Sequence, residues 1–308
     1  MATLREIRRR ISGVKNTQKI TKAMKMVAAA KLRRAQEAVI AARPYARKMQ
    51  ELLHKLSGIS DPTVHPLFER REVESVALIV VTADRGLCGA FNANIIRTAV
   101  QQIYTTYDKL HKDGKVNIIC VGRKAADYFG KNNYKIANKY IGIYGSLNFS
   151  HAQTIIDEVV RGFVAGEYDK VEIIYNEFKS IAQQRIATEQ VLPIQSLPTG
   201  QKAGITTDAS MKAGIPNQKS VLNYIFEPSS EAIILSLIPK HLNFQMWHAL
   251  LESNAAEQGA RMAAMDNATT NATDMIKALQ LSYNKARQSS ITKELLEIVS
   301  GAEALKAG

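Results

Sequence analysis

The feature that most constrains this chain is a pair of long segments, one at each end, in which apolar residues recur every three or four positions. In the first, residues 2–57, the seam runs through Leu4, Ile7, Ile11, Val14, Ile20, Met24 and Val27. This spacing is typical of a coiled-coil helix. About 55 helical residues at 1.5 Å each would span roughly 80 Å, so the segment must protrude from any domain of this size. We expect a slip in register at 16–18, and Pro44 to end or kink the helix.

The second segment begins at the helix-start signal Pro228-Ser-Ser-Glu231 and is expected to be interrupted at Pro239. From residue 241 to 305 nothing forbids one helix, and its seam reads Met262, Met265, Thr269, Ala272, Ile276, Leu279, Tyr283 and Ala286. Helical propensity alone seldom holds such lengths in water. The two terminal helices therefore most simply pair with each other. Chain direction makes the pair antiparallel, with the intervening residues forming a body at one end.

The middle of the chain alternates apolar, β-branched runs with helical patterns. Strands are predicted at 76–82, 116–122 and 171–175, with 185–194 as a further candidate, and helices at 91–107, 123–129 and 152–165. This alternation indicates a parallel α/β sheet covered on both faces. The predicted division is a coiled-coil helix at 1–58, an α/β domain at 72–196, a polar loop at 197–220 and a second coiled-coil helix at 228–308.

Positive charge is concentrated in the N-terminal helix. Of 41 Lys and Arg residues in the chain, fourteen lie in the first fifty positions, against only Glu6 and Glu37. Such a helix could bind nucleic acid through phosphates, bind an acidic protein surface, or simply be solvated. Aromatic residues for base stacking are lacking, since Tyr45 is the only one before Phe68. The pattern favours a protein partner, with a nucleic-acid-binding coiled coil as the alternative. The composition also fits a mitochondrial transit peptide, but the helical pattern continues without a processing break, so we interpret the segment as mature structure.

No motif for catalysis, cofactor binding or metal binding is found. The turn Asp84-Arg-Gly-Leu-Cys-Gly-Ala90 follows a strand but lacks the glycine spacing of nucleotide-binding loops. The six histidines show no zinc-site spacing. Cys88 and Cys120 are too few for a disulfide framework. No apolar run reaches the roughly 18–20 residues of a membrane span. The sequence therefore predicts a protein that is not an enzyme by itself, with no cofactor and no metal.

Three stretches carry a resemblance to a known family. They are Ile20-Thr-Lys-Ala-Met-Lys-Met-Val-Ala-Ala-Ala-Lys31 with Arg43-Pro-Tyr45, then Glu257-Gln-Gly-Ala-Arg-Met262, and finally Ile291-Thr-Lys-Glu-Leu-Leu-Glu-Ile-Val-Ser-Gly-Ala-Glu-Ala304. Together they resemble the γ subunits of F-type ATP synthases. The similarity covers both ends and the order of elements between them, which is nearly the whole chain.

The resemblance implies an α/β fold in which long N- and C-terminal helices form an antiparallel coiled coil beside a Rossmann-like domain. It implies the central rotary shaft of a proton-translocating synthase, with the α and β subunits of the catalytic head, the ε subunit and the c-ring as partners and no role for nucleic acid. It also implies a peripheral membrane location on the cytoplasmic face of a bacterial inner membrane, an organellar membrane being the less favoured alternative. The residues that match the family's contacts with the head are Met24, Lys25, Arg261, Arg287, Gln288, Thr292 and Glu297.

The resemblance leaves two points open. Met24 lies on the apolar stripe and could simply pack the seam. The loop at 199–218 matches no part of the family that we can place, and because it contains no cysteine, the redox switch of photosynthetic relatives is unsupported. The ε subunit and the c-ring are candidate partners for this loop.

Overall fold

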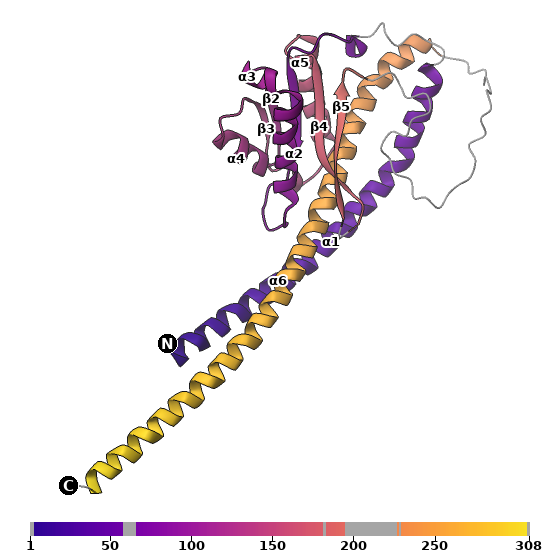
Figure 1. Ribbon diagram of the computed structural model, residues 1–308. Helices are drawn as coiled ribbons and strands as arrows, with labels where there is room; N and C mark the ends of the chain where they lie inside the picture. The colour runs from indigo at the N-terminus through magenta and orange to yellow at the C-terminus, as the bar shows by residue number, and fades with distance from the viewer. Residues whose placement is uncertain (1–2, 58–65, 181–182, 195–226, 228, 307–308) are drawn as a thin grey trace.

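The computed structural model describes residues 3–57, 66–180, 183–194, 227 and 229–306. Two helices dominate it, α1 (Leu4–Ser57) and α6 (Ser230–Lys306). They run side by side as a rod, and a compact α/β body lies along the part of α6 far from its C-terminus (Figure 1). The predicted fold class, an antiparallel coiled coil with a central α/β domain, is confirmed. The predicted polar loop at 197–220 lies outside the described residues.

Neither proline ends its helix. Pro44 lies inside α1 and Pro239 inside α6, so α1 does not end at Pro44, which was one of the two outcomes expected there, and the predicted interruption at Pro239 is wrong. A proline inside a helix removes one backbone hydrogen bond. Both prolines lie near contacts between the two helices, where the rings of Tyr45 and Phe244 are 5.1 Å apart. Ala46 and Ile238 are buried next to them.

The body is built on a five-stranded sheet in the order β3-β2-β1-β4-β5. Its strands are β1 (Val76–Val81), β2 (Val116–Val121), β3 (Ile136–Tyr140), β4 (Lys170–Phe178) and β5 (Gln184–Leu192). The first four are parallel, but β5 pairs antiparallel with β4. The prediction of a wholly parallel sheet is therefore wrong at this edge, because strands so close in the chain pair as a hairpin. Strand β3 was not predicted; only its alternate residues are shielded.

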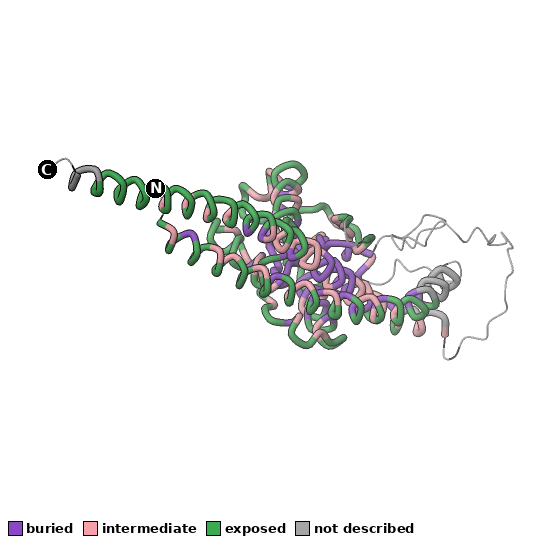
Figure 2. The backbone as a smooth tube through the Cα atoms, turned by 90° about the horizontal axis from the view of Figure 1, so that it is seen from below, coloured by how far each residue is buried: buried purple, intermediate pink, exposed green. Residues whose placement is uncertain are grey.

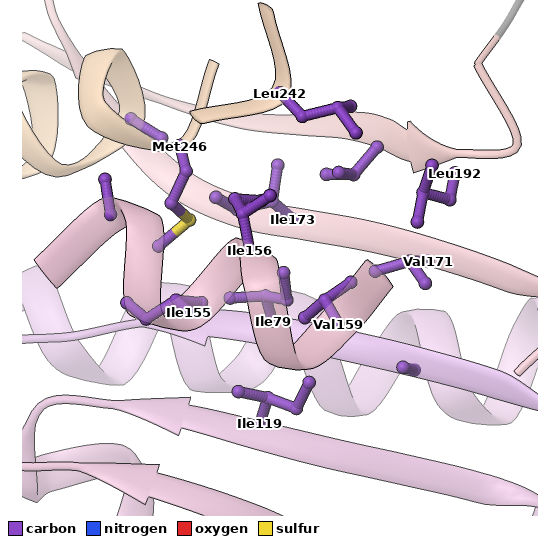
Figure 3. Close-up of a cluster of buried hydrophobic side chains, with 14 of the residues drawn as sticks. Ile79, Ile119, Ile155, Ile156, Val159, Val171, Ile173, Leu192, Leu242 and Met246 are labelled. Atoms are coloured by element: carbon purple, nitrogen blue, oxygen red, sulfur yellow. The ribbon is translucent and has the colours of Figure 1, made fainter. Parts of the chain in front are cut away.

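Helices cover both faces of the sheet. One face carries α2 (Phe91–Thr106) and α4 (Arg123–Lys131), and α3 (Asp108–Lys112) follows α2. The other face carries α5 (Phe149–Val164) and the body-side part of α6. Short 3-10 helices at Pro66–Phe68 and Ile143–Gly145 complete the body. In the core under α5, Ile155, Ile156 and Val159 meet the strand residues Ile79, Ile119 and Ile173, with Leu242 and Met246 of α6 above them (Figure 3). Helix α6 thus belongs to the body and to the rod.

Burial falls along the rod with distance from the body. The residues of α6 beside the sheet are mostly buried, whereas those near the C-terminus are exposed, and this end reaches well beyond the N-terminus of α1 (Figure 2). Among the described residues, no helix is both long enough and apolar enough to cross a membrane.

Candidate interaction surfaces of the rod

The seam of α1 becomes polar where the sequence predicted a slip. Instead of shifting to Ile20 and Val27, it continues through Gln18 and Thr21. Ile20 and Val27 are 60% and 57% exposed, so their assignment to the seam is wrong. The reason lies in α6. The Gln18 amide donates to the Thr273 hydroxyl at 2.7 Å, and the Thr21 and Thr269 hydroxyls lie 2.8 Å apart.

The contacts between the helices fix an antiparallel register. Lys25 forms an ion pair with Asp266 at 2.6 Å, one turn from the Thr21–Thr269 contact. As the α1 partner advances from Gln18 to Tyr45, the α6 partner recedes from Thr273 to Phe244. The predicted antiparallel direction is confirmed.

This register predicts which engineered cysteines can form a disulfide bond. We expect Thr21→Cys/Thr269→Cys to oxidise readily, because the two native hydroxyls are already in contact. Thr21→Cys/Met262→Cys is the matched control, since residue 262 lies about two helical turns, or roughly 10 Å, farther along α6. Non-reducing electrophoresis of both variants measures cross-linking. Faster cross-linking in the control would contradict the register.

The outer face of α1 combines apolar and basic side chains. Ile20, Met26, Val27 and Ile40 are between 57% and 66% exposed. Around them lies the basic collar, which we define as Lys19, Lys22, Lys25, Arg33 and Arg34. A groove of about 660 Å³ beside the collar is lined by Gln18, Lys19, Lys22, Lys25, Met26, Ala29, Asp266, Thr269 and Thr273. Several large apolar residues exposed together mark an interaction surface.

The C-terminal tip of α6, residues 287–302, forms a second exposed surface. Its large apolar residues are all about half exposed or more, namely Ile291, Leu295, Leu296, Ile298 and Val299. The tip reaches beyond the described start of α1 (Figure 1). A single helix cannot bury apolar side chains that lie on several of its faces, and helical propensity alone stabilises it little in water. We therefore expect another molecule to enclose this tip.

The predicted site residues fall into three places. Met24 and Lys25 lie partly shielded at the polar layer of the seam. Four others, Arg287, Gln288, Thr292 and Glu297, are exposed together on the tip. Arg261 lies apart from both groups, at the junction of α6 with the body, where its guanidinium contacts Glu257. Sequence reasoning missed Gln18 and Thr21, although the threonine at 269 in the α6 seam was a signal for a polar layer.

Comparison with known proteins identifies the family. Residues 3–305 match the family model described as ATP synthase. The ATP synthase gamma chain of Chlorobaculum tepidum is 52% identical over 99% of this chain and 100% of its own length. That of Chloroherpeton thalassium is 50% identical over 99% of both chains. This chain belongs to the ATP synthase γ-chain family.

Solved structures agree with this fold. A chain of the central stalk and c-ring of the Tetrahymena thermophila mitochondrial ATP synthase shares 26% identity with a TM-score of 0.57, over 81% of this chain and 99% of its own. A chain of the Euglena gracilis mitochondrial enzyme shares the fold with a TM-score of 0.67 at 23% identity, over 99% and 95% of the two chains. As a γ chain, the protein is the central-stalk subunit of an F-type ATP synthase. The nucleic-acid alternative receives no support from these relatives.

The cysteines of this γ chain have the character of packed thiols. Cys88 and Cys120 are both free and buried. Burial raises the pKa of Cys88, and it raises the pKa of Cys120 to about 12, so the reactive thiolate form is disfavoured at both. Within the described residues, no group of three or more His, Cys, Asp or Glu side chains could hold a metal ion.

The junction between γ-chain body and rod contains a buried carboxylate, Glu252. One oxygen accepts the backbone N–H of Phe178 at 2.9 Å, and the other lies 3.7 Å from His248. Burial raises the pKa of Glu252, with a further contribution from the nearby Glu177 carboxylate, while Phe178 N–H, His248 and Arg43 oppose the rise. The folded chain therefore holds this proton more tightly than the unfolded chain.

We expect Glu252→Gln to stabilise the γ chain above about pH 5 relative to the native protein. A raised pKa contributes stability below the unfolded value of roughly 4.3, and this contribution is lost as pH rises through the folded value. Glutamine can still accept from Phe178 but never ionises. The free energy of unfolding, measured from pH 4 to 8, should diverge in favour of the variant as pH rises. The exposed Glu72→Gln controls for loss of a surface charge, and parallel curves for Glu252→Gln and native protein would refute the prediction.

Proposed function

We propose that this chain is the non-catalytic rotor shaft that couples rotation of a membrane-embedded c-ring to conformational changes of the catalytic β subunits. The observation that carries this proposal is the rod itself. Its tip exposes Ile291, Leu295, Leu296, Ile298 and Val299, which would be unfavourable in water. A surrounding ring of α and β subunits supplies the enclosure that this tip lacks.

The two exposed surfaces have different roles in this proposal. The tip residues Arg287, Gln288, Thr292 and Glu297 would face the inside of the head. Met24 and the basic collar, which includes Lys25, would face acidic loops of the β subunits lower on the shaft. Such surfaces are compatible with rotation of the shaft inside the head, because exposed charge pairs are individually weak and form and break readily.

The body would form the foot, together with the ε subunit on the c-ring, and the division at 1–58, 72–196, 197–220 and 228–308 belongs to this proposal. The loop 199–218 would face the ε subunit or the c-ring. In this arrangement the chain lies peripherally on the cytoplasmic face of a bacterial inner membrane and carries no active site of its own. The turn after β1 supports this, because it lacks the glycine spacing of phosphate-binding loops.

Deleting residues 287–308 tests the proposed enclosure of the tip. We expect the truncated chain to fold, because its core lies in the body, but to bind the catalytic head more weakly than the full chain. Binding of an α/β head is measured by co-sedimentation at matched protein concentrations. A variant with Arg97→Met, on the exposed face of α2, controls for unrelated changes. Equal binding of the truncated and full chains would show that the tip is not enclosed by the head.

A further inference from the structure

Helix α6 passes the carboxyl ends of β1 and β4, where it contacts the turn after β1 and the last residue of β4. From β1 the sheet extends one way to β2 and β3, and the other way to β4. The strand order therefore changes direction beside β1, and in sheets of this kind ligands commonly bind at such a topological switch point. Here α6 itself fills it, because Ala256 and Ala260 pack against the core formed with β1 and α2.

Arg261 connects α6 to the turn that follows β1. Its Nη1 donates to the Glu257 carboxylate at 2.6 Å and to the Gln258 amide oxygen at 3.3 Å, and its Nη2 donates to the backbone carbonyl of Gly86 at 3.3 Å. The Arg261 and Glu257 side chains are only 13% and 7% exposed. Hydrogen bonds to buried ionised groups are stronger than neutral ones and are geometrically specific. The guanidinium therefore holds a backbone atom of the body at a fixed position against the shaft.

Other polar contacts bind α6 to the body before this point. Gln245 donates to the Gln190 carbonyl at 3.3 Å, Glu252 accepts from Phe178 N–H at 2.9 Å, and Gln184 donates to the Ala256 carbonyl at 3.0 Å. Among the described residues, the hydrogen bond from Arg261 to Gly86 is the polar contact between α6 and the body that lies farthest along α6 toward the rod. Beyond it, α6 continues as part of the coiled coil.

Helix α1 reaches the body mainly through α6. Leu32 and Ala35 of α1 pack with Ala255 of α6, and Phe178 of the body lies beside this small cluster. Rotation applied to the body must therefore enter the rod largely through α6.

We propose that Arg261, held by Glu257, is a positioning residue that locks the α/β body to the shaft where α6 leaves it, so that rotation passes from one to the other without slip. This inference rests on the proposed rotor function. It gives Arg261 a role inside the γ chain, whereas its family match implied contact with the catalytic head.

The test uses the assembled synthase carrying this chain, in inverted membrane vesicles. Arg261→Met removes the charge and the donors but keeps an apolar side chain of similar length. We expect ATP hydrolysis near the native rate and at least a threefold fall in protons pumped per ATP. The exposed Arg97→Met is the matched control and should leave this ratio unchanged. The double variant Glu257→Gln/Arg261→Met, which leaves no unpaired buried charge, should show the same loss of coupling while folding more stably than Arg261→Met alone.

An engineered disulfide distinguishes the proposed positioning role of Arg261 from a direct contact between Arg261 and the catalytic head. A Cβ added to Gly89 would lie 3.8 Å from the Cβ of Ala264, which is the separation found in disulfides. Gly89→Cys/Ala264→Cys, in a Cys88→Ser background to prevent exchange, should restore the pumping ratio of Arg261→Met when oxidised and lose it again when reduced. The positioning role of Arg261 would be contradicted if both Arg261 variants pumped the native number of protons per ATP. It would also be contradicted if the oxidised disulfide failed to restore this ratio in Arg261→Met. A native chain that failed to couple at all would instead contradict the rotor function.

Discussion

Replacing Gly122 with alanine is expected to destabilise the α/β body strongly. Gly122 follows β2 with a φ of +93°, and an added Cβ would lie 2.1 Å from the backbone oxygen of Thr82. Thr82 cannot move aside, because its N–H donates to the Val121 carbonyl at 2.8 Å and its hydroxyl accepts from Ala125 N–H at 2.9 Å. The clash and the backbone strain together should cost more than about 3 kcal/mol.

Gly114→Ala is the matched control for Gly122→Ala. Gly114 also has a positive φ, of +68°, but a Cβ added there would have no neighbour within 4 Å. Its substitution should therefore cost only the left-handed backbone penalty of about 1–2 kcal/mol. Urea unfolding of the two variants and the native chain measures the difference. Equal losses of stability in the two variants would show that the end of β1 yields to the added methyl group.

Reversing Lys19, Lys22 and Arg34 to glutamate together is expected to weaken binding of the rod to the catalytic head by about a hundredfold. All three are exposed. Each exposed ion pair is worth roughly 0.2–1 kcal/mol, and reversal replaces attraction by repulsion, so the total loss is on the order of 3 kcal/mol. Lys25 is left unchanged because it pairs with Asp266 across the coiled coil.

Single alanine substitutions at these three positions should each change affinity by less than about fivefold. Raising the salt concentration should reduce the difference between the triple variant and the native chain, because salt screens exposed charges. Co-sedimentation with the head in low and moderate salt measures both effects. Native affinity in the triple variant would show that the basic collar is only a solvated face.

Much of the fold follows from local sequence patterns. The strand at 76–81 is a continuous apolar run rich in β-branched residues and bounded by turn residues, and the terminal helices show a period of three to four over many turns. Such patterns reflect burial on one face and can be interpreted without knowing the partner. Strand β3, Ile136–Tyr140, could not be recognised in this way, because it lies at a sheet edge and includes Asn138 and Lys139.

The polar part of the seam shows why register is harder to predict than direction. When hydropathy alone is considered, Ile20 and Val27 fit the 3–4 pattern better than the polar Gln18 and Thr21 do. The choice depends on Thr269 and Thr273 of α6, which offer hydrogen-bond partners from far along the chain. The prolines were misjudged for the same reason, since the packing of Tyr45 on Phe244 is a tertiary contact.

The candidate interaction residues likewise include some that could be predicted from the sequence and some that could not. The exposed tip residues Arg287, Gln288 and Thr292 were identified through the family resemblance, and the structure places them on one exposed stretch of helix. Arg261 belongs to a junction that no local pattern reveals, because Gly86 lies 175 positions earlier in the chain. Its neighbour Glu257, four residues before it, was the only sequence signal of an ion pair.

Rotation of the body relative to an immobilised catalytic head distinguishes a rotor shaft from a static stalk. The head would be fixed to a surface, and a probe would be attached to the body through Tyr128→Cys, a partly exposed position on α4. In a Cys88→Ser/Cys120→Ser background this is the only thiol of the chain. The account predicts that ATP drives continuous rotation of the probe in one direction. ATP hydrolysis by the complex without net rotation of the probe would contradict it.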